Sequence, residues 1–123
     1  MAAFHSELAI RIIDDSAHGG SGRWRVIEPL TYYSDGFGMV VVPDGFETDL
    51  ASVPRFAYYA LFGNTAHKAA VVHDWLLEEG YPREDADREF LAAMRATGVP
   101  PWRRWPMYWA VRAFSLFTGE RNG

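Results

Sequence analysis

His73 and Asp74 stand side by side in a stretch whose apolar residues follow the spacing of a helix. In residues 65–79 the apolar side chains recur at intervals of three and four, which predicts one helix. This spacing places His73 on the apolar side and Asp74 about 100° further round. A carboxylate among apolar residues is costly to desolvate unless it is paired, so we expect Asp74 to have a partner.

A second acidic residue, Asp87, is also directed toward the core by spacing alone. A helix is predicted over residues 82–97, and Asp87 lies three residues before Phe90 and four before Leu91. It therefore shares the apolar stripe of that helix, where it too needs a partner.

A further set of polar residues lies in residues 45–55, among apolar neighbours. Asp and Ser side chains there can bond backbone amides, and a proline restricts the residue before it, so a fixed, non-repetitive loop is predicted. Its candidates are Asp49, Ser52 and Arg55. Our hypothesis is that one site brings together Asp49, His73, Asp74 and Asp87.

One interpretation of this set is a metal-dependent hydrolase. His73 with two or three of Asp49, Asp74 and Asp87 would form a mixed nitrogen and oxygen site for Zn²⁺, Mn²⁺ or Mg²⁺. Such an ion activates a water molecule. Adjacent helical residues diverge by about 100°, so His73 and Asp74 could bind the same ion only at the edge of the helix.

A second interpretation is acid–base catalysis without a metal. His73 would be oriented by Asp49 or Asp87 and would activate Ser52 as the nucleophile. The residues around Ser52 do not match the Gly-x-Ser-x-Gly turn of the α/β-hydrolases.

A third interpretation involves no reaction. The same residues would form a buried polar network, with Arg55 or Arg88 paired to Asp87, that fixes the loop on the helices. This interpretation predicts that Asp74→Ala destabilises the fold by roughly 3–5 kcal/mol if a buried charge loses its partner. A carboxylate that serves catalysis alone should cost much less.

The elements that must position these residues are strands first and helices afterwards. Strands are expected within about residues 7–48, joined by short turns, which favours an antiparallel β meander. Three to four helices are expected within about residues 56–118, at 56–62, 65–79, 82–97 and 107–117. The sequence therefore predicts one α+β domain over residues 1–123.

Composition excludes several classes of function. The net charge of −4 argues against a nucleic-acid partner. The absence of cysteine excludes disulfides, thiolate nucleophiles and Cys-ligated zinc. No apolar run is long enough for a membrane span, and the first residues do not resemble a signal peptide. The absence of cysteine also fits a cytosolic or virion-borne protein, and we do not expect secretion through a signal peptide.

The last predicted helix is apolar nearly all round, which is typical of a helix that is deeply packed or docked on a partner. Aromatic residues and arginine are enriched among interface anchors. The candidate binding residues are Trp102, Trp105, Tyr108 and Trp109, together with Arg55.

Three blocks of the sequence carry a family resemblance. They are VPDGFETDLASVPR (42–55), AAVVHDWLL (69–77) and REDADREF (83–90). Together they resemble a family of small proteins of tailed bacteriophages and prophages that is catalogued only as a domain of unknown function. The resemblance covers residues 24–112 and implies a phage or prophage origin, without an established chemistry.

Two main classes of function follow from this resemblance. One is a hydrolase that acts on the cell wall during entry or release, or on a host signalling molecule. The other is a non-enzymatic virion component or assembly protein, such as a tail, tail-tip or neck protein. Phage virion proteins or a host factor would then be the partners, and a protein that binds a host factor during takeover is a further alternative.

Overall fold

The computed structural model describes residues 2–14, 23–48 and 67–118. In these residues six strands precede three helices, so the predicted α+β class is confirmed. The strands are β1 (Ala3–Phe4), β2 (Ile10–Asp14), β3 (Arg23–Val26), β4 (Leu30–Ser34), β5 (Gly38–Val42) and β6 (Glu47–Thr48). The helices are α2 (His67–Glu78), α3 (Arg83–Ala96) and α4 (Pro101–Thr118). The helix predicted at residues 56–62 lies outside the described residues.

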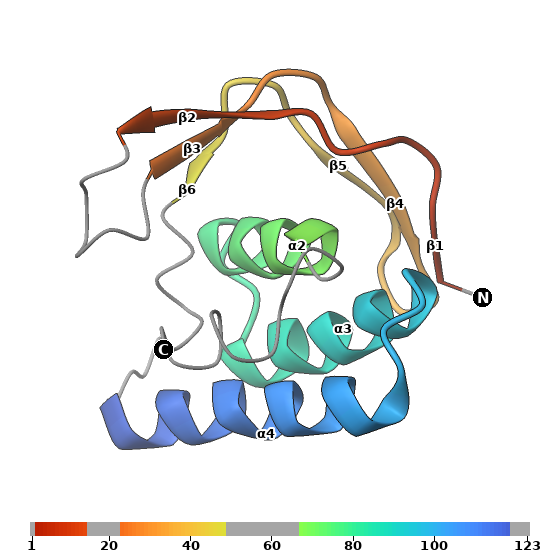
Figure 1. Cartoon of the computed structure of the whole chain (residues 1–123), viewed down its shortest axis with the longest axis vertical. Helices are drawn as coiled ribbons and strands as arrows, with labels where there is room; N and C mark the ends of the chain where they lie inside the picture. Colours follow the sequence, from red (N-terminus) through yellow and green to blue (C-terminus); the bar gives the residue numbers. More distant parts are fainter. Residues whose placement is uncertain (1, 15–22, 49–66, 119–123) are drawn as a thin grey trace.

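The strands form two antiparallel sheets, with orders β1-β4-β5 and β2-β3-β6. In chain order they make three long ribbons, β1 with β2, β3 with β4 and β5 with β6, and each ribbon bends from one sheet into the other. Backbone hydrogen bonds continue across the bend, for example from Ile27 N–H to the Ala9 carbonyl at 2.9 Å. The three ribbons follow one another as an antiparallel meander, and Figure 1 shows them as an arch.

Turn-forming residues lie where two of these ribbons bend. Pro29 separates β3 from β4, and Pro43-Asp44-Gly45 separates β5 from β6. Gly45 has a φ of 92°, which L-residues rarely adopt, so the bend requires glycine there. Because the sheets curve, their inner side chains converge on a single core.

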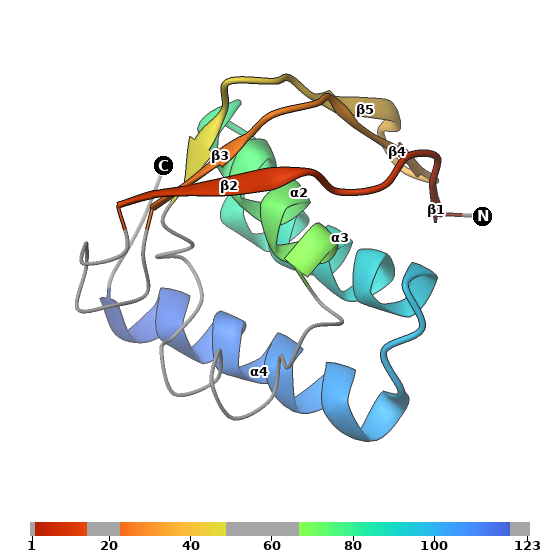
Figure 2. The same cartoon turned by 45° about the horizontal axis from the view of Figure 1, so that its top comes forward.

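Helix α2 lies in the hollow of the arch, as Figures 1 and 2 show. Its residues Ala69 to His73 are all buried, so this part of the helix is enclosed on every side rather than on one face. The core formed around it contains Val26, Leu30, Tyr32, Val40, Val42, Leu76, Phe90, Met94, Met107 and Val111.

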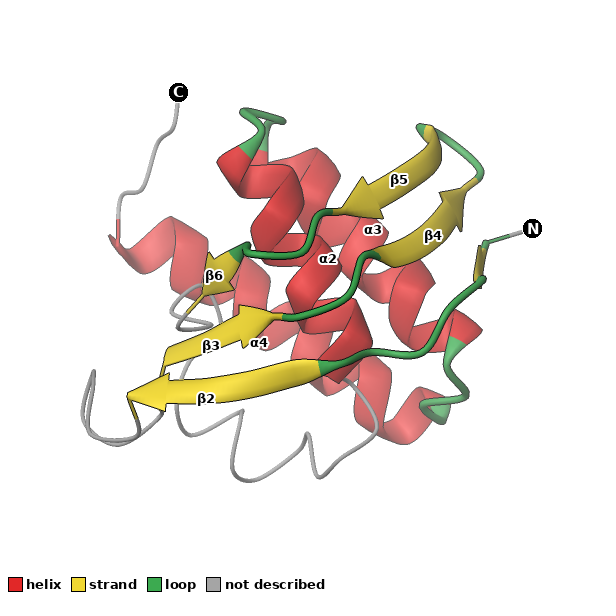
Figure 3. Cartoon of the chain, turned by 90° about the horizontal axis from the view of Figure 1, so that it is seen from above, coloured by secondary structure: helices red, strands yellow, loops and turns green. Residues whose placement is uncertain are grey.

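Helices α3 and α4 continue the stack below α2, so that α4 is the outermost layer (Figure 1). The view in Figure 3 shows both sheets lying over the three helices. Helix α4 begins at Pro101, whereas the prediction began it at residue 107. Pro101 occupies the first helical position, where proline loses no hydrogen bond, and Pro106 is accommodated inside the helix.

Candidate functional site

The candidate site begins with His73, which is fully buried near the middle of α2. Its ring packs against Phe90 of α3, with 5.2 Å between the ring centroids. Burial by helix packing fixes the ring, and its two nitrogens face acidic side chains on different elements. The predicted orientation of His73 toward the core is confirmed.

Asp87 of α3 holds one side of the imidazole. Its Oδ1 lies 2.5 Å from Nε2 of His73, and both side chains are completely buried. The other carboxylate oxygen, Oδ2, accepts a hydrogen bond of 2.9 Å from Arg112 of α4. The Arg112 side chain is only partly exposed, so Asp87 is enclosed between a histidine and an arginine.

Asp74 lies on the other side of the imidazole. Its Oδ1 is 3.8 Å from Nδ1 of His73, and its side chain is 10% exposed. Its second oxygen, Oδ2, accepts a hydrogen bond from the hydroxyl of Thr48, at the end of β6. The predicted need for a partner of Asp74 is thereby met by Thr48 and by the neighbouring histidine.

The two carboxylates favour the protonated form of His73. Burial is the largest single influence on the pKa of His73 and lowers it, because it disfavours the charged ring. The hydrogen bonds and negative charges of Asp74 and Asp87 together outweigh burial, so the pKa lies above the ordinary value of 6.5. The site is therefore built to hold a positive charge at the imidazole.

Three of the four residues predicted to converge are brought together: His73, Asp74 and Asp87. The fourth, Asp49, lies outside the described residues, as do Ser52 and Arg55. Within the described part of the chain, no group of three or more His, Asp or Glu side chains is arranged to hold a metal ion. Asp74 and Asp87 face opposite ring nitrogens, so a single ion bound to His73 would meet one of them and not both.

The predicted partners of Asp87 were Arg55 and Arg88. Arg55 lies outside the described residues, and the prediction for Arg88 was wrong. Arg88 instead forms exposed ion pairs of 3.3 Å with Glu84 and Asp85 on its own helix. Arg112 takes the role, and sequence reasoning missed it. The available signal was a lone arginine within the apolar part of the last helix, which implies a buried acidic partner.

The predicted binding residues of α4 form an aromatic surface. Trp102, Trp105 and Trp109 are 73%, 44% and 60% exposed, and their spacing of three and four places them on one helical face. Tyr108 is partly buried and contacts Trp105 and Trp109 edge to face, with centroid distances of 5.9 and 5.0 Å. We call Trp102, Trp105 and Trp109 the tryptophan face.

None of the helices in the described segments has the length and apolar character needed to cross a bilayer.

Comparison with curated proteins finds an uncharacterized protein, y4jT, of Sinorhizobium fredii (strain NBRC 101917 / NGR234). The two are 37% identical over 78 residues, and the match covers 59% of this chain. The chain spans only 23% of that relative's length. No solved structure matches the chain.

A family match covers most of the residues that build the site. It extends over residues 24–111, and so includes Thr48, His73, Asp74 and Asp87 but stops one residue before Arg112. On this match, the chain belongs to the family described as "Protein of unknown function (DUF1353)".

Proposed function

We propose that the protein is a metal-dependent hydrolase of phage or prophage origin, with its reactive centre between His73 and Asp74. The observation that carries this proposal is the placement of Asp74 Oδ1 3.8 Å from Nδ1 of His73, while Asp87 holds Nε2 at 2.5 Å. The origin is proposed from the resemblance of the sequence to phage proteins.

A neutral His73 would leave an unfavourable contact with Asp74 that a cation can relieve. If neutral His73 donates its Nε2 hydrogen to Asp87, its Nδ1 carries a lone pair that faces the carboxylate of Asp74. Two electron-rich atoms then oppose each other in a largely buried place, which is unfavourable. A proton on Nδ1 or a metal ion between the two atoms removes this conflict.

The spacing of these atoms is compatible with a metal ion. Two ligand bonds of roughly 2.0–2.2 Å span up to about 4.2 Å, and the atoms are 3.8 Å apart. When bound, such an ion would supply an activated water for hydrolysis. Zn²⁺ suits imidazole and carboxylate ligands together, whereas Mn²⁺ and Mg²⁺ would be held mainly by carboxylate oxygens, and we propose Asp49 as a further ligand.

In this proposal Asp87 orients the histidine instead of binding the ion. Histidine ligands usually donate their second ring N–H to a carboxylate, which fixes the tautomer and increases the basicity of the ligand. Arg112 in turn balances the charge of Asp87 through its bond of 2.9 Å. In the metal-free alternative, Asp87 would hold Nε2 of His73, and Nδ1 would have to activate Ser52.

A hydrolysis screen tests the proposal. Wild type is incubated with Zn²⁺, Mn²⁺ or Mg²⁺ and with peptidoglycan, nucleotide second messengers and p-nitrophenyl esters and phosphates. We expect one substrate class to be cleaved, with a loss of at least about 100-fold in Asp74→Asn and about 10–100-fold in Asp87→Asn.

Asp85→Asn is the matched control for both variants, because Asp85 is a partly exposed carboxylate of α3 whose ion pair with Arg88 lies at the surface. Its activity should equal that of wild type. If folded Asp74→Asn retains wild-type activity, or if no substrate class is cleaved with any metal, the hydrolase proposal fails and a purely structural network explains the site.

The tryptophan face supports a second candidate function, that of a non-enzymatic virion or assembly component. Three exposed tryptophans on one face of an outer helix are unusual for a surface with no partner, and tryptophan is the residue most enriched among interface anchors. A tail, tail-tip or neck protein, or a host factor, would dock there.

Mass spectrometry of purified virions tests this second candidate. The expected result is detection of the protein at a fixed copy number per virion, which Trp102→Lys with Trp109→Lys abolishes without unfolding the chain. Normal incorporation of the folded double variant, or absence of the protein from virions, contradicts it.

A further inference from the structure

Strand β5 lies at the end of its sheet in the described part of the chain. It is the last strand in the order β1-β4-β5, so within the described residues it pairs on one side only, with β4. Alternate residues of an edge strand direct their N–H and C=O groups outward, where another strand can bond them. Proteins usually block such edges with charge or proline, but β5 reads Gly-Met-Val-Val-Val. Its Met39 and Val41 are 55% and 48% exposed.

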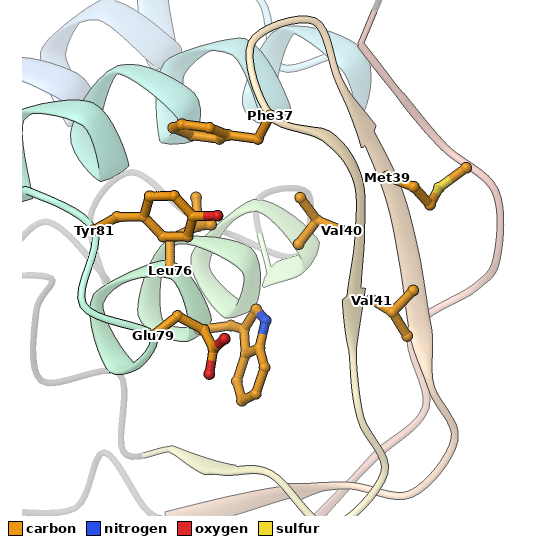
Figure 4. A pocket seen from close by; sticks show the side chains of 8 residues that line it. Phe37, Met39, Val40, Val41, Leu76, Glu79 and Tyr81 are labelled. Carbon is orange, nitrogen blue, oxygen red and sulfur yellow. The ribbon is translucent and has the colours of Figure 1, made fainter.

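A cavity of about 210 Å³ lies along this edge. Its lining includes Met39, Val40 and Val41, whose side chains alternate between the two faces of the strand. In Figure 4, Val40 points toward Tyr81 and Leu76, while Met39 and Val41 project from the other side of β5. The cavity therefore borders the strand edge itself, and not one face of the sheet alone.

The opposite wall of the cavity comes from α2 and the residues after it. Its aromatic rings belong to Trp75 and Tyr81, and Phe37 packs against Tyr81 with 4.6 Å between the ring centroids. Glu79 is the one acidic residue among the residues that line the cavity, which include no lysine or arginine, and it is exposed. Aromatic rings beside a carboxylate bind a cationic side chain through cation–π attraction and an ion pair.

We propose that β5 and this cavity bind an extended segment of another protein, which adds a strand to β5 and places a lysine or arginine between the aromatic rings and Glu79. Addition of a strand supplies main-chain hydrogen bonds, and the pocket supplies specificity for the side chain.

A second copy of this chain fits the edge and the cavity less well than such a segment. Residues 35–46, which would pair in a twofold arrangement, contain two aspartates and no basic residue, so they bring no cation to Glu79.

An array of random octapeptides, probed with the labelled full-length chain, tests the proposal. Peptides that bind should combine β-branched residues with lysine or arginine.

The best-binding peptide is then measured in solution with variants of the chain. Glu79→Gln should weaken its binding about threefold to fivefold, which is the effect of one exposed ion pair. Glu84→Gln is the matched control, because Glu84 is an exposed glutamate outside the cavity, and its binding should equal wild type. Amide exchange of residues 38–42 should slow when the peptide is bound.

Four results would overturn the proposal. They are an array without binders, binders that lack lysine and arginine, equal affinity for wild type and Glu79→Gln, and binding that leaves the amides of β5 unprotected. A chain that dimerises with protected β5 amides and does not bind peptides would show that a second copy covers the edge.

Discussion

The charge on the imidazole of His73 links stability to pH. The folded state raises the pKa of His73 above its ordinary 6.5, although burial opposes this, because Asp74 and Asp87 stabilise the protonated ring. A raised pKa contributes stability that is fully present below the unfolded value and is lost as pH rises through the folded value. The stability that protonated His73 contributes should therefore decrease as the pH rises above about 6.5.

Urea denaturation of the metal-free protein between about pH 6 and pH 9 measures this effect. The unfolding free energy of wild type should fall across the range, and His73→Asn, which cannot titrate, should show a flatter profile. A wild-type stability that rises over this range, or an unchanged slope in the variant, would contradict the assignment.

Asp87 is the residue whose loss should cost most. Asp87→Asn keeps the shape of the side chain but leaves protonated His73 and Arg112 without their shared counter-charge in a buried place. We expect a destabilisation of about 3 kcal/mol in urea denaturation. The variant Asp85→Asn, at a partly exposed position of the same helix, should stay within about 0.5 kcal/mol of wild type. Equal unfolding free energies of Asp87→Asn and Asp85→Asn would show that the contacts of Asp87 with His73 and Arg112 contribute little to stability.

Local spacing predicted some of this site and not the rest. The burial of His73 and Asp87 follows from helical periodicity, because each lies on an apolar stripe of its own helix. The contacts of Asp74 with Thr48 and of Asp87 with Arg112 join elements 26 and 25 residues apart in the chain. Such contacts depend on tertiary packing, which periodicity does not encode.

At the scale of elements, one buried hydrogen bond joins the sheet to α3. The hydroxyl of Tyr32 on β4 donates to Glu89, which is 9% exposed. Burial first, and then the hydrogen bond and charge of Glu89, raise the pKa of Tyr32, so the phenol remains a donor at all physiological pH values. This bond fixes how the strand lies on the helix.

Tyr32→Phe should destabilise the protein by about 1–3 kcal/mol, because it leaves a buried carboxylate without this donor. Tyr33→Phe is the matched control, since Tyr33 neighbours it on β4 and is 37% exposed. Thermal unfolding of both variants gives the comparison. Similar melting temperatures would mean that the Tyr32–Glu89 bond is energetically neutral.

Most of the strands and helices could be predicted from the sequence. Their first and last residues were the least predictable part. Strong turn residues and apolar periodicity located β4, β5, α2 and α3 within a few residues. The two-residue strands β1 and β6 carry too little pattern to be recognised. The predicted start of α4 at residue 107 was wrong, because the helix begins at Pro101 and continues through Pro106, where a proline ordinarily ends or kinks a helix.

In the whole molecule, the polar site crosses every layer. Thr48 of β6, His73 and Asp74 of α2, Asp87 of α3 and Arg112 of α4 form one connected series. If every polar group in it is hydrogen-bonded, such a series allows the layers to pack in one arrangement only. It also holds the ring of His73 rigidly, as a reaction would require. A structural role and a catalytic role therefore predict similar losses of stability for Asp87, and they differ in whether the Asp74 side of the histidine binds a cation.

The most direct test is metal content, measured by elemental analysis after purified protein is loaded with Zn²⁺, Mn²⁺ or Mg²⁺ and passed through a desalting column. Near-UV circular dichroism confirms folding of wild type, Asp74→Asn and the control Asp85→Asn. The proposed function predicts about one ion per chain in wild type and Asp85→Asn, and none in folded Asp74→Asn. Wild type without bound metal, or folded Asp74→Asn with as much metal as wild type, would contradict a metal centre between His73 and Asp74.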